Sequence, residues 1–154
     1  MSGEGLLEEV GAADVAMIDV YNFKRINDVH GHGIGDRALA IVAQTLKNSV
    51  RQDRDVVARI GGDEFAMLIS DLSLPQAESR LRMLSSSLAS TNLELPSAAP
   101  PVLTLSCGLA EHAAGDTVES LMERADRALY DAKRLGKNRV VATVKPTLRD
   151  LRKP

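Results

Sequence analysis

The sequence predicts an α/β fold, an α+β sandwich in which helices pack around a mixed, largely antiparallel sheet. Short apolar runs of strand length alternate with longer stretches whose apolar residues recur at helical spacing. Two of the short runs flank Gly61 and Gly62, and two glycines between strand-like runs are typical of a tight β-hairpin with φ above zero. A hairpin inserted into βα units is incompatible with a purely parallel sheet and indicates a plan close to split βαβ.

The first half of the chain is expected to contain one strand, two helices and the hairpin. These elements are expected at residues 14–19, 23–29, 35–50 and 56–69. Gly31 and Gly33 break the chain between the two helices. The longer helix is amphipathic, with an apolar stripe at Leu39, Val42, Leu46 and Val50.

The second half is expected to contain two further helices and two strands. A helix begins near Ser73, which forms a capping-box pair with Gln76. After it come an irregular connection, a strand, a helix and a strand, at residues 90–101, 102–109, 117–135 and 140–144. Asp116 and Glu119 are expected to cap the last helix, and Gly136 is expected to end it.

Composition indicates one globular domain. The 154 residues are enough for a single core, and the hydrophobic share of 44% and charged share of 26% are ordinary. The net charge of −2 gives no strong field toward nucleic acid or a membrane, and no apolar run reaches the ~18–20 residues of a membrane span. No signal-peptide pattern opens the chain, so a cytoplasmic compartment is expected. The single cysteine, Cys107, lies in an apolar run and is expected to be buried and reduced.

Acidic residues stand at two strand ends that the predicted fold brings together. Asp19 ends the first strand, and Asp63 and Glu64 lie at the hairpin. Paired carboxylates offer the hard oxygen ligands that divalent cations prefer, and such sites commonly handle phosphates. Each signal is weak alone, because a carboxylate at a strand end usually serves a turn or cap. Lys133 and Lys137 would by themselves indicate a solvated helix end.

The order of the motifs resembles that of the GGDEF domains, the diguanylate cyclases. The matching segments are 19–28 with Gly31-His32 and Gly35-Asp36, 59–65, 106–110, and 125–133 with Gly136-Lys137-Asn138. The resemblance covers about residues 13–142 and implies the fold of a nucleotidyl cyclase catalytic domain with a catalytic hairpin. On this basis residues 1–13 form a lead-in, residues 14–144 the GGDEF domain and residues 145–154 a polar, basic tail.

The resemblance implies that two GTP molecules condense into cyclic di-GMP with release of pyrophosphate. Asp19, Asp63 and the carbonyl of Val20 match the family's ligands for two Mg²⁺ ions, which Mn²⁺ could replace. Such ions neutralise phosphate charge and lower the pKa of the attacking 3′-hydroxyl. Glu64 matches a residue that assists deprotonation of that hydroxyl or metal binding, and Lys24 completes the implied catalytic set.

The resemblance also implies a set of nucleotide-binding residues. Three lysines match positions that meet the phosphates, and Asn27 and Asp36 match guanine readers. The hairpin glycines would admit the nucleotide without a Cβ in the way. His32 either touches the nucleotide or only holds the glycine-flanked turn. The full implied set is Phe23, Lys24, Asn27, His32, Asp36, Gly61, Gly62, Lys133 and Lys137.

The implied partners follow from the reaction. Because one site holds one GTP and the product requires two, the resemblance implies a transient homodimer with two-fold symmetry. It also implies a sensory or receiver domain upstream in the parent protein. No nucleic-acid or membrane partner is expected.

The sequence departs from the family pattern at three places. Tyr21 stands where an aspartate is common, and we expect the site to be tuned rather than lost because Asp19 and Asp63 remain. Gln52 stands where the Arg-x-x-Asp product-inhibition site has its arginine, so feedback is expected to be weak although Asp55 is in place. The usual Asp-x-Leu-Thr segment and helix are absent before the first strand, which brings stability and turnover into question.

Three functions remain open at this point. The intact segment 61–65 favours a cyclase. Tyr21 and the short N-terminus favour a regulatory module that binds GTP or cyclic di-GMP without turnover. A pure dimerisation or regulatory domain would leave the guanine and phosphate residues unexplained.

Overall fold

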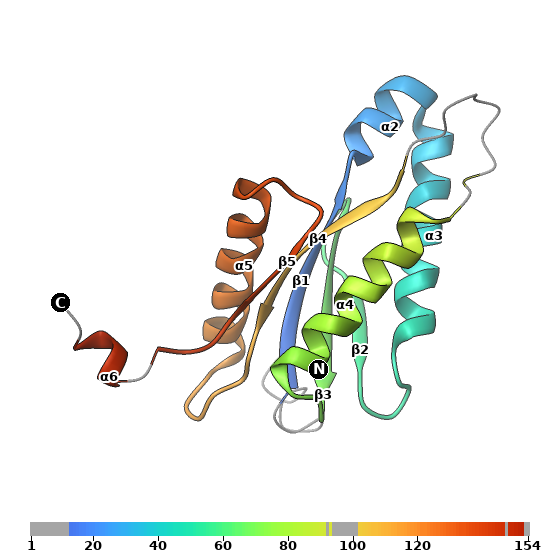
Figure 1. Ribbon diagram of the computed structural model, residues 1–154. Helices are drawn as coiled ribbons and strands as arrows, with labels where there is room; N and C mark the ends of the chain where they lie inside the picture. Colours follow the sequence, from blue (N-terminus) through green and yellow to red (C-terminus); the bar gives the residue numbers. More distant parts are fainter. Residues whose placement is uncertain (1–12, 92, 94–101, 147, 153–154) are drawn as a thin grey trace.

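The fold is built on one five-stranded sheet with the strand order β2-β3-β1-β4-β5 (Figure 1). The computed structural model describes residues 13–91, 93, 102–146 and 148–152. Its strands are β1 (Ala13–Tyr21), β2 (Val56–Arg59), β3 (Glu64–Ser70), β4 (Thr104–Ala110) and β5 (Val140–Thr143). Neighbouring strands are antiparallel except β4 and β5, which are parallel. The predicted mixed, largely antiparallel sheet is therefore confirmed.

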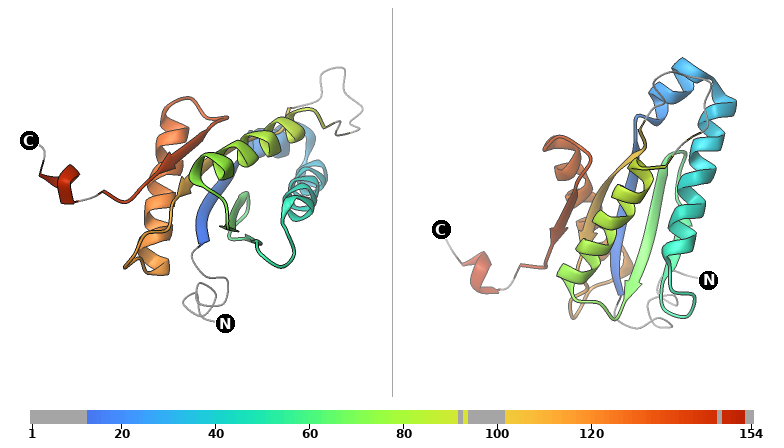
Figure 2. Two further views of the ribbon diagram at one scale, coloured as in Figure 1. Left: turned by 60° about the horizontal axis from the view of Figure 1, so that its bottom comes forward. Right: turned by 45° about the vertical axis from the view of Figure 1, so that its right-hand side comes forward.

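Helices pack on both faces of this sheet (Figures 1 and 2). α2 (Phe23–His30), α3 (His32–Ser49) and α4 (Leu74–Ala89) lie on one face and α5 (Val118–Arg134) on the other. The short α6 (Leu148–Leu151) lies beyond β5, away from the sheet (Figure 1). Val15 and Met17 of β1 belong to the core cluster under α5, whereas Ile18 and Val20 belong to the cluster under α3 and α4. Because successive strand residues point to opposite faces, Asp19 shares the α5 face with Val15 and Met17.

Two neighbouring residues of β4 show how closely the helices pack. A Cβ at Gly108 would come within 2.2 Å of backbone atoms of Ala125 and Leu129, so glycine is required for α5 to lie this close to the sheet. Cys107 belongs to the opposite core cluster, where its complete burial raises the pKa of its thiol to about 12. The expected buried, unpaired cysteine is confirmed.

The hairpin differs from the predicted Gly-Gly turn. Four residues, 60–63, join β2 to β3, and neither Gly61 nor Gly62 has a positive φ. The Arg59 guanidinium holds the loop by donating to the carbonyls of both glycines, at 3.1 Å and 2.6 Å. A four-residue connection does not need the left-handed backbone of a two-residue hairpin turn, so the expectation of φ above zero was wrong.

The helix caps agree with the sequence in one case and differ in another. The capping box predicted at Ser73 is present. The cap of α5 is Thr117, with Ser120 as its reciprocal partner, rather than Asp116 with Glu119. The Asp116 carboxylate is instead engaged in an ion pair with an arginine of α5, which leaves Thr117 to accept from the free backbone donors of the first turn.

The break between α2 and α3 is shorter than expected. α3 begins at His32 rather than at residue 35, so Gly33 lies inside its first turn and only Gly31, with φ of 88°, separates the two helices. A single glycine inside a helix costs only about 1 kcal/mol, which α3 tolerates because its apolar stripe is buried. Residues 1–12 of the lead-in and most of the connection at 90–101 lie outside the described residues. Among the described helices, none has the length and apolar character needed to cross a membrane.

Candidate functional site

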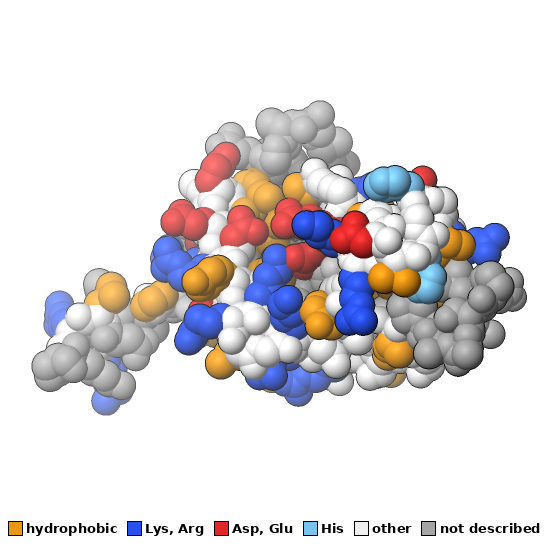
Figure 3. Space-filling view, turned by 90° about the horizontal axis from the view of Figure 1, so that it is seen from above, with side chains coloured by type: hydrophobic (Ala, Val, Ile, Leu, Met, Phe, Trp, Pro, Cys, Tyr) orange, Lys and Arg blue, Asp and Glu red, His pale blue; other side chains and the backbone are white. Residues whose placement is uncertain are grey.

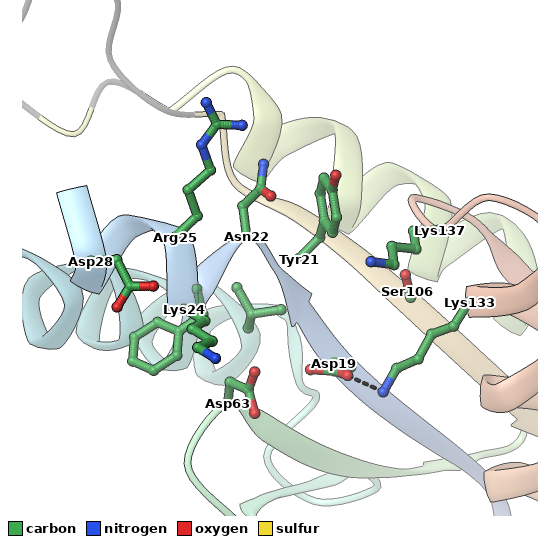
Figure 4. A pocket seen from close by; sticks show the side chains of 12 residues that line it. Asp19, Tyr21, Asn22, Lys24, Arg25, Asp28, Asp63, Ser106, Lys133 and Lys137 are labelled. Carbon is green, nitrogen blue, oxygen red and sulfur yellow. Dashed lines mark ion pairs between the residues drawn. The ribbon is translucent and has the colours of Figure 1, made fainter. Parts of the chain in front are cut away.

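A cavity of about 550 Å³ opens where β1 ends, bordered by α2, the β2–β3 hairpin and the end of α5 (Figure 4). Acidic and basic side chains are interspersed over this end of the molecule (Figure 3). The cavity is lined by Asp19, Val20, Tyr21, Asn22, Phe23, Lys24, Arg25, Asp28, Asp63, Ser106, Lys133 and Lys137. The predicted metal ligands and the three predicted phosphate-binding lysines are all among these residues.

The sheet register brings together two carboxylates that are distant in sequence. Asp19 of β1 pairs with Glu64 of β3, and the backbone N–H of Val20 donates to the carbonyl of Asp63 at 3.1 Å. The last turn of the hairpin is thereby fixed against the end of β1. As a result Asp19 and Asp63 face the same cavity.

The Asp19 carboxylate disfavours the charged form of its neighbour Asp63. Burial raises the pKa of Asp63, and the negative charge of Asp19 raises it further. One carboxylate oxygen of Asp19, Oδ1, is buried without a hydrogen-bond partner in the described part of the chain. A buried, unpaired acceptor beside a second carboxylate fits a divalent cation, which binds hard oxygen ligands and offsets their repulsion. The residues present therefore fit the metal that the sequence implies.

Lys133 supplies the positive charge that the protein itself places against these acids. It projects from the last turn of α5 and forms an ion pair with Asp19 (Figure 4). Burial lowers the pKa of Lys133, but the hydrogen bond and charge of Asp19, together with the charges of Glu64 and Asp63, outweigh it and raise that pKa overall. Lys133 is therefore a permanent ammonium whose partner is a predicted metal ligand.

The α2 side of the cavity carries further charged groups. Asn22 adopts a left-handed backbone, with φ of 67°, and turns the chain from β1 into α2. The turn places Lys24, Arg25 and Asp28 around the cavity. In Figure 4 the amine of Lys24 lies on the side of Asp63, whereas Arg25 points away from the carboxylates. Together with the exposed N-terminus of α2, these cations favour an anionic ligand.

The predicted guanine readers, Asn27 and Asp36, lie apart from the cavity lining, and so does His32. Asp36 and His32 are exposed near the start of α3, and Asn27 is half-buried on α2. The side-chain oxygen of Asn27 is buried without a hydrogen-bond partner among the described residues. It occupies the space left by Gly35, where a Cβ would lie 1.6 Å from that oxygen. The close contact of α2 and α3 thus holds Asn27 in place and leaves its acceptor unsatisfied.

The hairpin glycines and Glu64 also lie outside the lining residues. Any Cβ on Gly62 would have no atom within 4 Å, so the backbone there stands open to a ligand. Glu64 is half-buried, and its charge acts on Lys133. It therefore belongs electrostatically to the site although it does not border the cavity.

Four lining residues were not singled out by the sequence reasoning. They are Asn22, Arg25, Asp28 and Ser106. All four lie inside the segments 19–28 and 106–110 that carried the family resemblance, so the motifs contained the only available signal. Ser106 is buried, and its hydroxyl accepts from the backbone N–H of Asn138 at 3.1 Å.

The predicted product-inhibition residues lie in different environments. Gln52 is exposed on the turn between α3 and β2. The Asp55 side chain is fully buried and pairs with Arg51 at 3.0 Å and Arg80 at 2.7 Å. Its oxygens also accept from the backbone N–H groups of Arg51 and Ser70, at 3.0 Å and 3.2 Å. Asp55 is therefore satisfied by the protein's own donors.

Comparison with known proteins shows that the sequence matches a known family. Residues 8–139 match the family described as "Diguanylate cyclase, GGDEF domain". The chain is 38% identical over 126 residues to the diguanylate cyclases DgcP of Pseudomonas aeruginosa and DgcM of Escherichia coli K12, covering 82% of this chain in both alignments. These alignments cover 18% and 30% of the two relatives, so the chain spans less than a third of their length.

Solved structures show the same architecture. The GGDEF domain of DgcB from Caulobacter crescentus, in complex with c-di-GMP, superposes with a TM-score of 0.80 at 35% identity, over 90% of this chain and 82% of that one. The active GGEEF domain of a diguanylate cyclase from Vibrio cholerae superposes with a TM-score of 0.77 at 27% identity, over 92% and 90%.

Proposed function

This chain belongs to the GGDEF domain family, and we propose from that premise that it is a diguanylate cyclase that condenses two GTP molecules into cyclic di-GMP. In this reaction each 3′-hydroxyl attacks the α-phosphate of the other nucleotide, and the bond to pyrophosphate breaks, so two pyrophosphates are released. The observation that carries the proposal is the carboxylate pair of Asp19 and Asp63, with its unpaired buried oxygen, in one cavity with three lysines.

The acidic side of the cavity suits divalent cations. Asp19, Asp63 and the carbonyl of Val20 would hold them, and we propose two Mg²⁺ ions, for which Mn²⁺ could substitute. When bound, such ions neutralise the reacting phosphates and lower the pKa of the attacking hydroxyl. Glu64 lies opposite Asp19 in the sheet and is the proposed acceptor of the hydroxyl proton.

The basic side of the cavity suits the triphosphate. Lys24 and Lys137 are proposed to bind phosphate oxygens, which shields charge that would otherwise repel the attacking group. Lys133 is already paired with Asp19, so its proposed role is shared between orienting that carboxylate and meeting a phosphate. Phe23 borders the cavity, and Gly61 and Gly62 expose bare backbone beside it.

The proposal is tested by incubating the purified chain with GTP and Mg²⁺ and separating the products by ion-pair chromatography. Formation of cyclic di-GMP and two equivalents of pyrophosphate supports the cyclase. GTP binding without either product would support the second candidate, a regulatory module that binds GTP or cyclic di-GMP without turnover. Tyr21 is the observation that favours this second candidate, because it brings a phenol to the cavity where the family commonly has a carboxylate.

Base selection is expected to favour guanine. Asn27, whose amide can donate and accept, and the exposed carboxylate of Asp36 are the proposed guanine readers, because guanine offers an N1–H and an N2 amine that adenine lacks. Because ATP would lose both the charge-assisted and the neutral hydrogen bond, its affinity for the chain should be about 100-fold lower than that of GTP. The measurement is displacement of a fluorescent GTP analogue by each nucleotide.

A test variant and its matched control for this measurement lie next to each other on α3. Asp36→Ala should reduce the preference for GTP over ATP. Arg37→Ala, at the next exposed position, should leave that preference unchanged. Equal displacement by GTP and ATP in the native chain would remove both residues from the guanine-reading role.

Assembly of the product requires two copies of the chain. We propose a transient homodimer with two-fold symmetry in which each copy presents one GTP. Initial velocity per protomer should then rise with protein concentration before it reaches a plateau. Because the alignments cover only 18% and 30% of the two relatives, we further propose that a sensory or receiver domain in a longer parent protein drives this pairing.

Product feedback is expected to be weak. Gln52 lacks the charged fork that grips a phosphate or a guanine edge, and the oxygens of Asp55 are occupied by internal donors. Restoring the cation with Gln52→Arg should tighten inhibition by cyclic di-GMP about 10- to 100-fold, the worth of one charge-assisted hydrogen bond. The measurement is initial velocity against cyclic di-GMP concentration, with Asp53→Arg as the control at the adjacent exposed position. Submicromolar inhibition of the native chain would show that another arginine already serves this site.

A further inference from the structure

We propose that Tyr21 is a positioning residue that presents the ammonium group of Lys137 to the phosphates of the bound nucleotide. This inference rests on the proposed function, since it assigns how one residue of that site is held. Tyr21 is the last residue of β1 and lines the cavity together with Lys137. The Lys137 Nζ lies 4.9 Å from the centroid of the Tyr21 ring, which is within the range of a cation–π interaction (Figure 4).

The backbone that carries Lys137 is fixed to the sheet and to α5. Gly136 and Lys137 end the helix in a Schellman motif, in which their N–H groups donate to Lys133 O at 3.3 Å and Ala132 O at 3.0 Å. The next N–H, of Asn138, donates to the Ser106 hydroxyl at 3.1 Å. Because of these bonds, the root of the Lys137 side chain is held at the rim of the cavity.

The local backbone is unfavourable unless it is held in this way. Gly136, Lys137 and Asn138 all have positive φ values, of 123°, 63° and 46°. A lysine in this region carries a steric cost that glycine does not. The bonds described above therefore hold Lys137 in a backbone conformation that directs its side chain toward Tyr21.

The two lysines of this rim differ in their partners. The positive charge of Lys133 is balanced by the carboxylate of Asp19 in their ion pair. Lys137 forms no ion pair among the described residues, and its contact is the face of an uncharged ring. An aromatic face attracts the ammonium without cancelling its charge, whereas an aspartate at position 21 would compete with a phosphate for it. Tyr21 thus keeps Lys137 ordered and fully available to an anionic ligand.

The test compares nucleotide affinity in Tyr21→Leu, Tyr21→Phe and Lys137→Met, and in the double variant that combines Tyr21→Leu with Lys137→Met. Tyr21→Leu should weaken GTP binding about 3- to 10-fold, the range expected for a partly exposed cation–π contact. Tyr21→Phe keeps the ring face and should stay within about 2-fold of the native affinity. In the double variant, Tyr21→Leu should add nothing to the loss that Lys137→Met causes alone.

Two controls separate this role from a general structural one. Guanosine carries no phosphate, so its competition with a fluorescent guanosine analogue should be the same in the native chain and in Tyr21→Leu. Tyr130→Leu removes the chain's other tyrosine, which is exposed on α5 away from the cavity, and should leave GTP affinity unchanged.

Native GTP affinity in Tyr21→Leu, an equal loss for guanosine, or a full additional loss in the Lys137→Met background would each overturn the inference. If the native chain binds GTP but makes no cyclic di-GMP, the cyclase proposal falls while the binding comparison still decides the role of Tyr21. If the native chain does not bind GTP, both proposals fail together.

Discussion

Asp63→Asn is expected to lower cyclase activity by about 100-fold or more while leaving the fold intact. The substitution keeps the size of the side chain but removes one of the two carboxylates that face the cavity. Because burial and the charge of Asp19 raise the pKa of Asp63, keeping this carboxylate ionised costs more free energy in the folded protein than in the unfolded chain. The neutral amide should therefore leave the melting temperature unchanged or raise it slightly.

The two readouts are measured together, as initial velocity with Mg²⁺ and as thermal unfolding without nucleotide. Asp126→Asn is the matched control, because that aspartate is exposed on α5 and does not border the cavity. The thermal shift that Mg²⁺ and GTP produce in the native chain should also shrink in Asp63→Asn. Near-normal turnover in Asp63→Asn would refute the assignment of this carboxylate to the metal site, and a large fall in stability would assign it a structural role instead.

Asp55→Ala is expected to destabilise the protein by about 3 kcal/mol, at the lower end of the cost of breaking a buried ion pair. The Asp55 side chain is fully buried, and its removal would leave the arginines of both ion pairs without their shared carboxylate. The lower end applies because Arg51 and Arg80 remain 35% and 20% exposed and can recover some hydration. For a domain of this size the melting temperature should fall by roughly 6–12 °C.

The same contact predicts a pH dependence of stability. Burial raises the pKa of Asp55, but the hydrogen bonds from Arg51, Arg80 and Ser70 outweigh it and hold that pKa well below its usual range. A carboxyl whose folded pKa is depressed contributes stability that is fully present above its unfolded pKa, about 3.9, and is lost as the pH falls toward its folded value. The stability difference between the native chain and Asp55→Ala should therefore be smaller at pH 3 than at pH 7.

Urea unfolding at the two pH values measures this difference, with Asp53→Ala as the control two positions earlier on the same turn, where the side chain is exposed. A loss below about 1 kcal/mol at pH 7, the size typical of a surface pair, would contradict the structural role of Asp55. The large loss expected here also means that Asp55→Ala is a poor probe of product binding, because unfolding would obscure any change in inhibition.

Much of the fold could be predicted because its signals are local. The apolar run at residues 14–19 lies within β1, and the helical spacing of Leu39, Val42 and Leu46 places these residues in the core. The hairpin turn was predicted less well, because the presence of two glycines does not determine how many residues the connection uses. The cap of α5 was also missed, because Asp116 and Thr117 are both suitable caps and an ion pair with α5 engages the first of them.

The sequence alone determined the strand and helix pattern, the family resemblance and the residue types at the cavity, because each depends on local spacing and order. Only the tertiary structure decided which of these groups meet. The ion pair between Asp19 and Lys133 requires α5 to lie on the β1 face that Asp19 shares, at the close distance that Gly108 permits. The hydrogen-bonded environment of the Asp55 carboxylate depends on Arg80, which is 25 residues away on α4. Such contacts depend on how elements pack against each other, and packing joins residues whose separation in sequence carries no periodic signal.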